Sequence, residues 1–151
     1  MINKLRVRAQ SDSGFTLVEL LVVMLILGLL AAIAIPSFFN QRDKAKDSDA
    51  KAQVRTAQTA IETYATDHGG SYVDADAVAL KAIEPSLNNA NITTVTGGAK
   101  SYTVTVTSDV AGQTFTITRA DSGLVDSNCT VQNKGGCPDG GNWAAENDPA
   151  A

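Results

Sequence analysis

The stretch that decides the fold is FTLVELLVVMLILGLLAAIAI, residues 15–35 of the chain. In these 21 residues Glu19 is the only ionisable side chain. A helix rises about 1.5 Å per residue, so this segment spans roughly 30 Å, which is the thickness of the hydrocarbon core of a bilayer. We therefore expect a membrane-spanning helix over this segment.

The segment in front of this helix is a short basic leader. Lys4, Arg6 and Arg8 lie in it, and short basic flanks stay in the cytoplasm, so the carboxyl-terminal part is expected to face outward. An ordinary secretory signal carries its small-residue cleavage site after the apolar run. Here the small polar residues 10–14 precede the run, so a cut after Gly14 removes the leader and leaves the helix on the mature protein.

The stretch GFTLVELLVVMLILGLLAAIAIP, residues 14–36, resembles the prepilin signature of type IV pilins and of the pseudopilins of type II secretion systems. The resemblance implies that a prepilin peptidase cuts between Gly14 and Phe15 and methylates the new amino terminus of Phe15. It also implies an α+β pilin fold, in which one long helix packs on a small antiparallel sheet followed by a carboxyl-terminal disulfide loop. The resemblance extends over residues 14 to about 66.

The same resemblance implies a location and partners. Before assembly the chain would cross the bacterial cytoplasmic membrane once, in contact with lipid and with its carboxyl terminus outside. After assembly it would lie in an extracellular helical filament made of copies of itself. Its other partners would be the prepilin peptidase and the pilus or secretion machinery of the inner membrane.

Glu19 is unusual because a carboxylate in hydrocarbon is costly, and intramembrane acids are usually paired or functional. The resemblance implies that Glu19 pairs with the amine of Phe15 on a neighbouring subunit and sets the axial register of the filament. The alternative is that Glu19 lies near the cytoplasmic interface and reaches water.

Two helix breakers, Gly28 and Pro36, lie within or next to the apolar run. A glycine costs about 1 kcal/mol relative to alanine in a helix, and a proline about 3 kcal/mol. A kink at Pro36 would fall at the membrane surface. The resemblance implies that the stretch between them loses helical structure inside the filament, whereas the alternative is a permanent bend without function.

Beyond Pro36 the helical pattern continues and becomes amphipathic. One apolar stripe recurs at steps of three and four residues: Ala50, Val54, Ala57, Ile61 and Tyr64. The charged residues are expected to form a solvated face: Arg42, Asp43, Lys44, Lys46, Asp47, Asp49, Lys51, Arg55 and Glu62. On that face Asp47 and Lys51 would make a weak attractive pair. The helix is expected to end near residues 67–70, where two glycines permit a left-handed cap.

The remaining residues predict a small sheet. Residues 71–100 are expected to form a connection containing a short helix, which Asp74 or Asp76 caps and Pro85 ends. Strict alternation over residues 102–107 and 114–118 predicts a hairpin whose apolar face covers the helix stripe. Residues 124–125 are a possible third strand. Trp143 either caps the core or points outward.

Cys129 and Cys137 are the only cysteines, and they lie in a part of the chain that should be exported. A disulfide is the expected state there. The resemblance supports this bridge, since many type IV pilins close such a loop and pseudopilins more often lack it. No cysteine or histidine pair completes a zinc site, because the sole histidine, His68, lies at a helix end.

No metal or cofactor is expected. Five acids near the carboxyl terminus suggest a calcium site, but their spacing fits no EF-hand loop, and scattered surface acids are the commoner explanation: Asp121, Asp126, Asp139, Glu146 and Asp148. The chain has 12 basic and 16 acidic residues. Removing residues 1–14 takes away three basic and one acidic residue, leaving 9 and 15 and a net charge of −6. Such a head does not attract nucleic acid by its overall field.

These features predict four regions: a leader over residues 1–14, a membrane and filament-core helix over 15–36, its amphipathic continuation over 37–66, and an extracytoplasmic head over 67–151. We expect a structural subunit of a type IV pilus. A pseudopilin of a type II secretion system is the alternative. A membrane-anchored enzyme or binding module ranks last, because the sequence has no recognisable nucleophile and base, metal cluster or phosphate loop.

Overall fold

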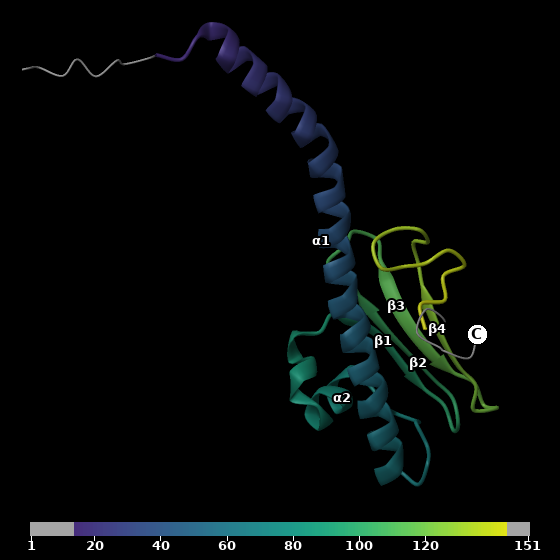
Figure 1. Cartoon of the computed structure of the whole chain (residues 1–151). Coiled ribbons are helices and arrows are strands. Elements are labelled where there is room, and N and C mark those ends of the chain that lie inside the picture. The colour runs from purple at the N-terminus through teal and green to yellow at the C-terminus, as the bar shows by residue number, and fades with distance from the viewer. Residues whose placement is uncertain (1–13, 145–151) are drawn as a thin grey trace, which may run out of the picture. The chain divides into compact units, whose positions relative to one another are not determined.

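The computed structural model describes residues 14–144. The predictions made for Lys4, Arg6 and Arg8 of the leader, and for Glu146 and Asp148 of the tail, lie outside the described residues. The chain divides into two compact units, residues 1–37 and residues 38–151, which are described separately. One helix, α1 (Leu17–Asp67), contributes residues to both units (Figure 1).

In the first unit, α1 is long and apolar enough to cross a membrane, and it is the one helix among residues 14–144 for which this holds. None of its most apolar stretch is buried within the chain. Both Gly28 and Pro36 lie within α1, which stays helical at these positions. A membrane or another protein is therefore needed to cover this part of α1.

In the second unit, α1 buries the predicted apolar stripe, and Ala60 and Ala65 are buried beside it. The helix ends as expected, since Gly69 and Gly70 both have positive φ angles of 67° and 89°. The amide of Gly70 donates to the carbonyl of Ala65 over 2.7 Å, a bond that caps the last helical turn.

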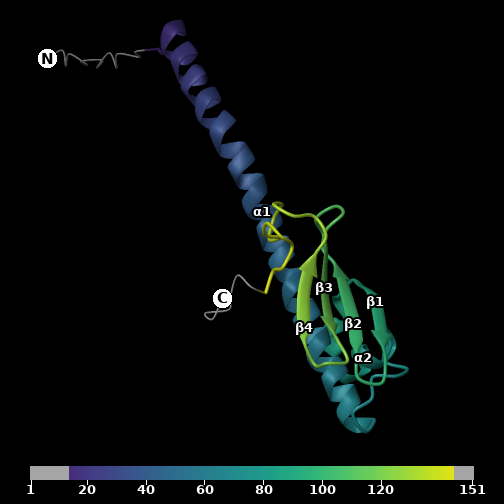
Figure 2. The ribbon, with the colours of Figure 1, turned by 90° about the vertical axis from the view of Figure 1, so that its right-hand side faces the viewer.

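A four-stranded antiparallel sheet packs on this half of α1: β1 (Ile92–Gly97), β2 (Tyr102–Thr107), β3 (Thr114–Arg119) and β4 (Val125–Cys129). The strands follow one another in the order β1-β2-β3-β4, as Figure 2 shows. Tyr102, Val104 and Val106 of β2 share the buried face with Phe115 and Ile117 of β3. The predicted hairpin and the α+β class are confirmed.

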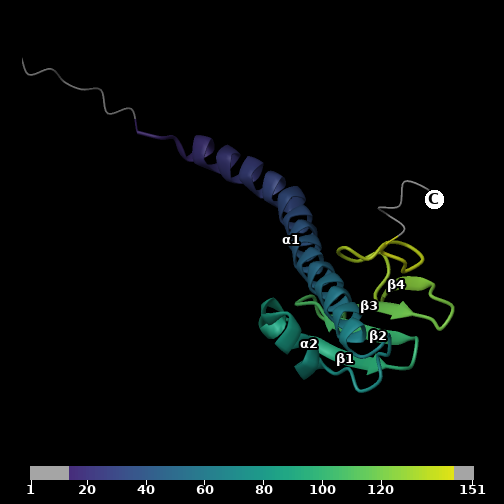
Figure 3. The same ribbon diagram turned by 90° about the horizontal axis from the view of Figure 1, so that it is seen from below.

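The short helix α2 (Ala77–Ile83) begins after Asp76, whose carboxylate accepts a hydrogen bond from the amide of Ala79 over 2.7 Å. Leu80 of this helix is buried in the core. A 3-10 turn, η1 (Pro85–Asn89), follows and leads into β1. Figure 3 shows α2 beside α1, near β1 at the edge of the sheet.

The sheet is larger than predicted. The stretch called a connection contains β1, and the possible third strand is β4, which extends to Cys129. A register shift between Ile92 and Thr94 breaks the alternation of β1, so the period of two that marks a strand is lost there. Trp143 is buried, with 1% of its surface exposed, so it caps the core.

Candidate functional site

The amino-terminal end of α1 places Glu19 one turn from Phe15. The hydroxyl oxygen of Thr16 accepts a hydrogen bond from the amide of Glu19 over 3.2 Å, so Thr16 caps the helix. Glu19 stands in the first turn, where the partial positive charge of a helix amino terminus favours a carboxylate. Phe15 is 77% exposed. The predicted cleavage and assembly residues therefore lie on an accessible segment.

Around Glu19 the surface of α1 is apolar and exposed. Large apolar side chains point outward along the segment: Leu17, Val18, Leu20, Leu21, Val22, Val23, Met24, Leu25, Ile26, Leu27, Leu29, Leu30, Ile33 and Ile35. A contiguous apolar surface of this extent marks a membrane or protein interaction site. Glu19 is the single charge within it.

At the other end of the chain, Cys129 and Cys137 form a disulfide with 5.8 Å between their Cα atoms, as predicted. The loop lies beyond the end of β4. The backbone of Trp143 returns to this strand, where its amide donates to the carbonyl of Ser127 and its indole Nε1 donates to the carbonyl of Asn128, each over 3.1 Å. The disulfide segment is therefore fastened to the sheet by residues on both sides of it.

Asp47 corrects the expectation of a solvated charged face. It is fully buried, and its carboxylate accepts two hydrogen bonds, from Ser108 Oγ over 2.6 Å and from the amide of Gly136 over 2.7 Å. The expectation that Asp47 is exposed to solvent is wrong, whereas its pairing with Lys51 stays a prediction. The sequence did contain a signal for this burial. The apolar stripe recurs at steps of three and four residues, and Asp47 lies three residues before Ala50, on the same face of α1.

Gly135 explains how the disulfide loop comes so close to this carboxylate. Its φ angle is +60°, and a Cβ atom built on it would lie 2.1 Å from Asp47 Oδ2. Only glycine fits both the conformation and the space. Asp47 therefore joins three segments: α1, the turn after β2 and the disulfide loop.

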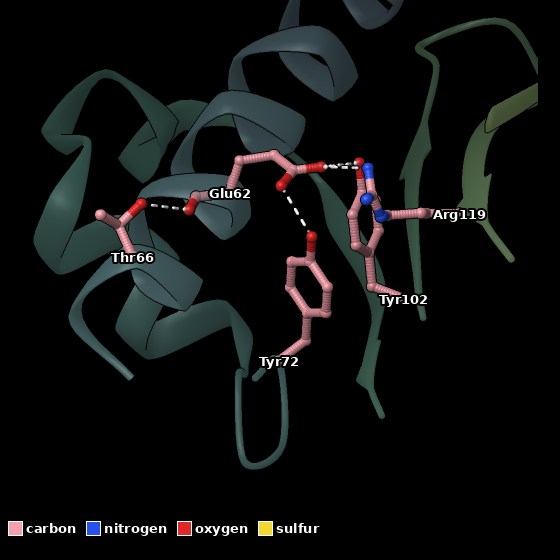
Figure 4. Close-up of polar contacts among 5 residues, drawn as sticks. All are labelled: Glu62, Thr66, Tyr72, Tyr102 and Arg119. Carbon is pink, nitrogen blue, oxygen red and sulfur yellow. Dashed lines mark hydrogen bonds and ion pairs between the residues drawn. The ribbon is translucent and has the colours of Figure 1, made fainter. Parts of the chain in front are cut away.

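Glu62 organises a second polar cluster, shown in Figure 4. Its carboxylate accepts hydrogen bonds from the hydroxyls of Tyr72 over 2.7 Å and Tyr102 over 3.1 Å. Arg119 Nη1 lies 3.4 Å from Glu62 Oε1 in an ion pair. Burial, followed by the nearby Glu62, raises the pKa of Tyr72, and burial raises the pKa of Tyr102 to about 12. This cluster ties α1 to β2 and β3.

A third feature is a row of cations on α1. Lys44, Ser48, Lys51 and Arg55 follow one another at helical spacing and border two adjoining hollows of about 420 and 390 Å³. The disulfide loop lines the first hollow and Trp143 the second. The guanidinium carbon of Arg55 lies 5.1 Å from the centre of a ring of Trp143, within the range of a cation–π contact.

No group of three or more His, Cys, Asp or Glu side chains within residues 14–144 is arranged to hold a metal ion. Asp121 and Asp126 lie about the β3–β4 turn, whereas Asp139 lies in the disulfide segment and is near Asn133. The first unit is thus an exposed apolar helical segment with one carboxylate. In the second unit, the polar contacts of Asp47 and Glu62 link α1 to the sheet and to the disulfide loop.

Comparison with known proteins finds relatives of part of this chain. Residues 10–35 match the family model described as the prokaryotic N-terminal methylation motif. The chain is 39% identical over 59 residues to the type II secretion system core protein G of Pseudomonas aeruginosa, a stretch covering 39% of this chain and 42% of that protein. It is 43% identical over 53 residues to the type IV major pilin protein PilA of Myxococcus xanthus, covering 35% and 24%. Over these stretches the chain is similar both to type IV pilins and to type II secretion pseudopilins.

A longer match joins the chain to the type IV wide pilus major component PilA4 of Thermus thermophilus. The two are 28% identical over 122 residues, which cover 81% of this chain and 92% of that protein. The two relatives named before it are matched over less than half of their own length. No solved structure matches the chain significantly.

Proposed function

We propose that this chain is a structural subunit of a type IV pilus, made as a precursor and assembled through the amino-terminal half of α1. The observation that supports the proposal best is the exposed apolar surface of that helix, with Glu19 as its single charge one turn from Phe15. An exposed apolar surface of this size marks a membrane or protein interaction site, so outside the membrane other protein chains must cover it.

The chemistry of assembly depends on two groups about one helical turn apart, the amine of Phe15 and the carboxylate of Glu19. A prepilin peptidase cuts the bond between Gly14 and Phe15, and the new amine of Phe15 is methylated and remains a cation. In the membrane or in a filament core, the Glu19 carboxylate needs a cation, because an unpaired charge is costly in apolar surroundings. The Phe15 amine of a neighbouring copy supplies it, and the pair sets the axial position of each new subunit.

The partners follow from this route. Lipid covers the apolar helix before assembly, with the head outside the cytoplasmic membrane, and other copies cover it in the extracellular filament. The inner-membrane assembly machinery moves the subunit from one environment to the other. Gly28 and Pro36 allow α1 to change its helical structure during this transfer. The role is structural, and no catalytic step is assigned to the chain.

A second candidate is a pseudopilin that builds a short filament for protein export, and the relationship to core protein G favours it. The Cys129–Cys137 disulfide and the relationship to two pilus subunits favour the pilus. The two functions use the same amino-terminal chemistry, so the length and location of the filament decide between them.

The test is intact mass and electron microscopy of material sheared from cells that produce the full chain. We expect long fibres whose subunit begins at N-methylated Phe15 and carries an oxidised Cys129–Cys137 pair. Glu19→Ala should abolish the fibres, because a neighbouring amine then has no partner. Asp49→Ala, which removes an exposed carboxylate from the second unit's part of α1, should leave them intact.

Other results separate the alternatives. A processed subunit that stays in the envelope, with no sheared fibres and a defect in exporting other proteins, would establish the pseudopilin. A chain that keeps residues 1–14 would rule out both candidates, since processing exposes the amine that pairs with Glu19.

A further inference from the structure

We propose that the cationic groove of one head receives the β3–β4 turn of a second copy of the chain. The cationic groove is defined by Lys44, Lys51 and Arg55, beside the buried Trp143. The acidic turn is defined by residues 120–126, with Asp121, Leu124, Val125 and Asp126. This contact rests on the proposed filament function, and it names a surface that each copy uses toward the next.

The cationic groove is a local exception on an acidic protein. Lys44, Lys51 and Arg55 lie at steps of seven and four residues, so they form one row along α1. None of the described residues that line the two hollows carries a carboxylate. Beside the row, Arg55 and Lys51 lie 5.1 and 5.7 Å from ring centres of Trp143. Trp143 itself is buried, with 1% of its surface exposed, so the groove offers a partner the positive charge of the row.

The acidic turn has the complementary chemistry. Leu124 and Val125 are 74% and 44% exposed in this turn. Asp121 and Asp126 are both exposed on either side of them. A hydrogen bond closes the turn, from the amide of Ala120 to the carbonyl of Leu124 over 2.9 Å, and Gly123 within it has a φ angle of +91°. Two exposed carboxylates on one turn are complementary in charge to a row of cations on α1.

The two surfaces lie at opposite ends of the same compact unit. Strand β4 pairs Cys129 with Phe115 at the end that carries the disulfide loop, and Val125 with Arg119 at the other end. Asp47 of α1 contacts the disulfide loop, and Glu62 contacts Arg119. These positions are 15 residues apart, or about 22 Å along a helix. Figure 2 shows the loop and the turn at these two ends.

Because of this separation, the acidic turn does not reach the groove of its own chain, whereas the turn of a second copy does. A contact between two different surfaces of identical subunits repeats without closing when its rotation does not form a ring, and it then generates a helical filament. The groove and the turn therefore add a contact between heads to the one made by the apolar helices.

The test reverses charges on each side and then on both. Lys44→Glu with Arg55→Glu, and separately Asp121→Lys with Asp126→Lys, should each lower the yield of sheared fibres roughly tenfold, because like charges then face each other. The combined four-site variant should recover most of the yield, since the pairing is restored with opposite sign. A control, Asp49→Lys with Asp67→Lys, makes the same charge change as the Asp121 and Asp126 pair but outside both surfaces, and it should leave the yield near that of the unmodified chain.

A cross-link gives a second measurement on intact fibres. Ser48 borders the cationic groove, and Ser122 lies in the acidic turn. A chain with Ser48→Cys and Ser122→Cys should therefore form a ladder of disulfide-linked oligomers on oxidation. Ser122→Cys alone should not. Trp143 fluorescence and the native disulfide report whether each variant is folded, and only folded variants are compared.

The outcomes separate this contact from the proposed function. Fibres that are lost in Glu19→Ala but unchanged in both reversal pairs, without a cross-linked ladder, would overturn the contact and leave the filament function in place. Reversals that reduce fibres without rescue in the combined variant would show that another partner, such as residues 145–151 of the same chain, occupies the groove. An unmodified chain that makes no fibres would overturn both.

Discussion

The carboxylate of Asp47 accepts a hydrogen bond from the amide of Gly136, with 2.7 Å between Oδ2 and N, although the two residues are 89 positions apart. The other oxygen of Asp47 accepts a hydrogen bond from Ser108 Oγ, which in turn accepts one from the amide of Val110. A single buried carboxylate thereby fixes the disulfide loop and the turn after β2 against the helix. The position of the groove beside Trp143 depends on this arrangement.

Asp47→Ala should lower the free energy of unfolding by about 2–4 kcal/mol, because it leaves the Ser108 hydroxyl and the Gly136 amide without their acceptor. Asp47→Asn should cost less, about 1 kcal/mol, since an amide can accept from Gly136 and donate to Ser108. Urea unfolding of the full chain in detergent, followed by Trp143 fluorescence, measures both. Equal losses in the two variants would contradict the account, and Asp49→Ala is the control for removing an exposed carboxylate.

Gly135→Ala should destabilise the same loop while the Asp47 side chain itself stays unsubstituted. The added methyl would lie 2.1 Å from Asp47 Oδ2, and the φ angle of +60° is unfavourable for alanine. We expect a loss of about 2 kcal/mol or more in unfolding free energy. Gly140→Ala is a suitable comparison, because its φ angle is also positive at 85° but no atom lies within 4 Å of its added Cβ. A loss no larger than that of Gly140→Ala would show that the loop moves away at little cost.

Removal of the disulfide should lower the unfolding free energy by about 2–3 kcal/mol, as expected for closing a loop of about nine residues. The measurement compares the oxidised chain with the same chain under reductant, which avoids placing a serine at Cys137, a buried position. The Asp47 contacts remain in the reduced chain, so the head should stay folded with Trp143 buried. Loss of the native fluorescence on reduction alone would contradict this.

Features of the fold could be predicted where the deciding residues are neighbours in the sequence, and not where they come from distant segments. The hairpin of β2 and β3 was predictable because apolar and polar residues alternate without interruption over each strand. Strand β1 was missed because its register shift near Thr93 breaks that alternation. The burial of Asp47 is not local, since its partners come from the turn after β2 and from the disulfide loop. Glu62 was likewise expected on the solvated face, and only the fold brings Tyr72, Tyr102 and Arg119 to it.

The cluster around Glu62 predicts a loss of stability at high pH. Burial raises the pKa of Tyr102 to about 12, and the pKa of Tyr72 is raised as well, so both tyrosines release their protons more readily in the unfolded chain. Their contribution is complete below the unfolded pKa of about 10, and it is lost as the pH rises toward 12. Urea midpoints of the full chain in detergent should fall over this range, and tyrosinate absorbance should appear with unfolding. Tyr102→Phe should flatten the fall, because it removes one of the two groups. A slope unchanged in Tyr102→Phe would assign the loss of stability to other residues.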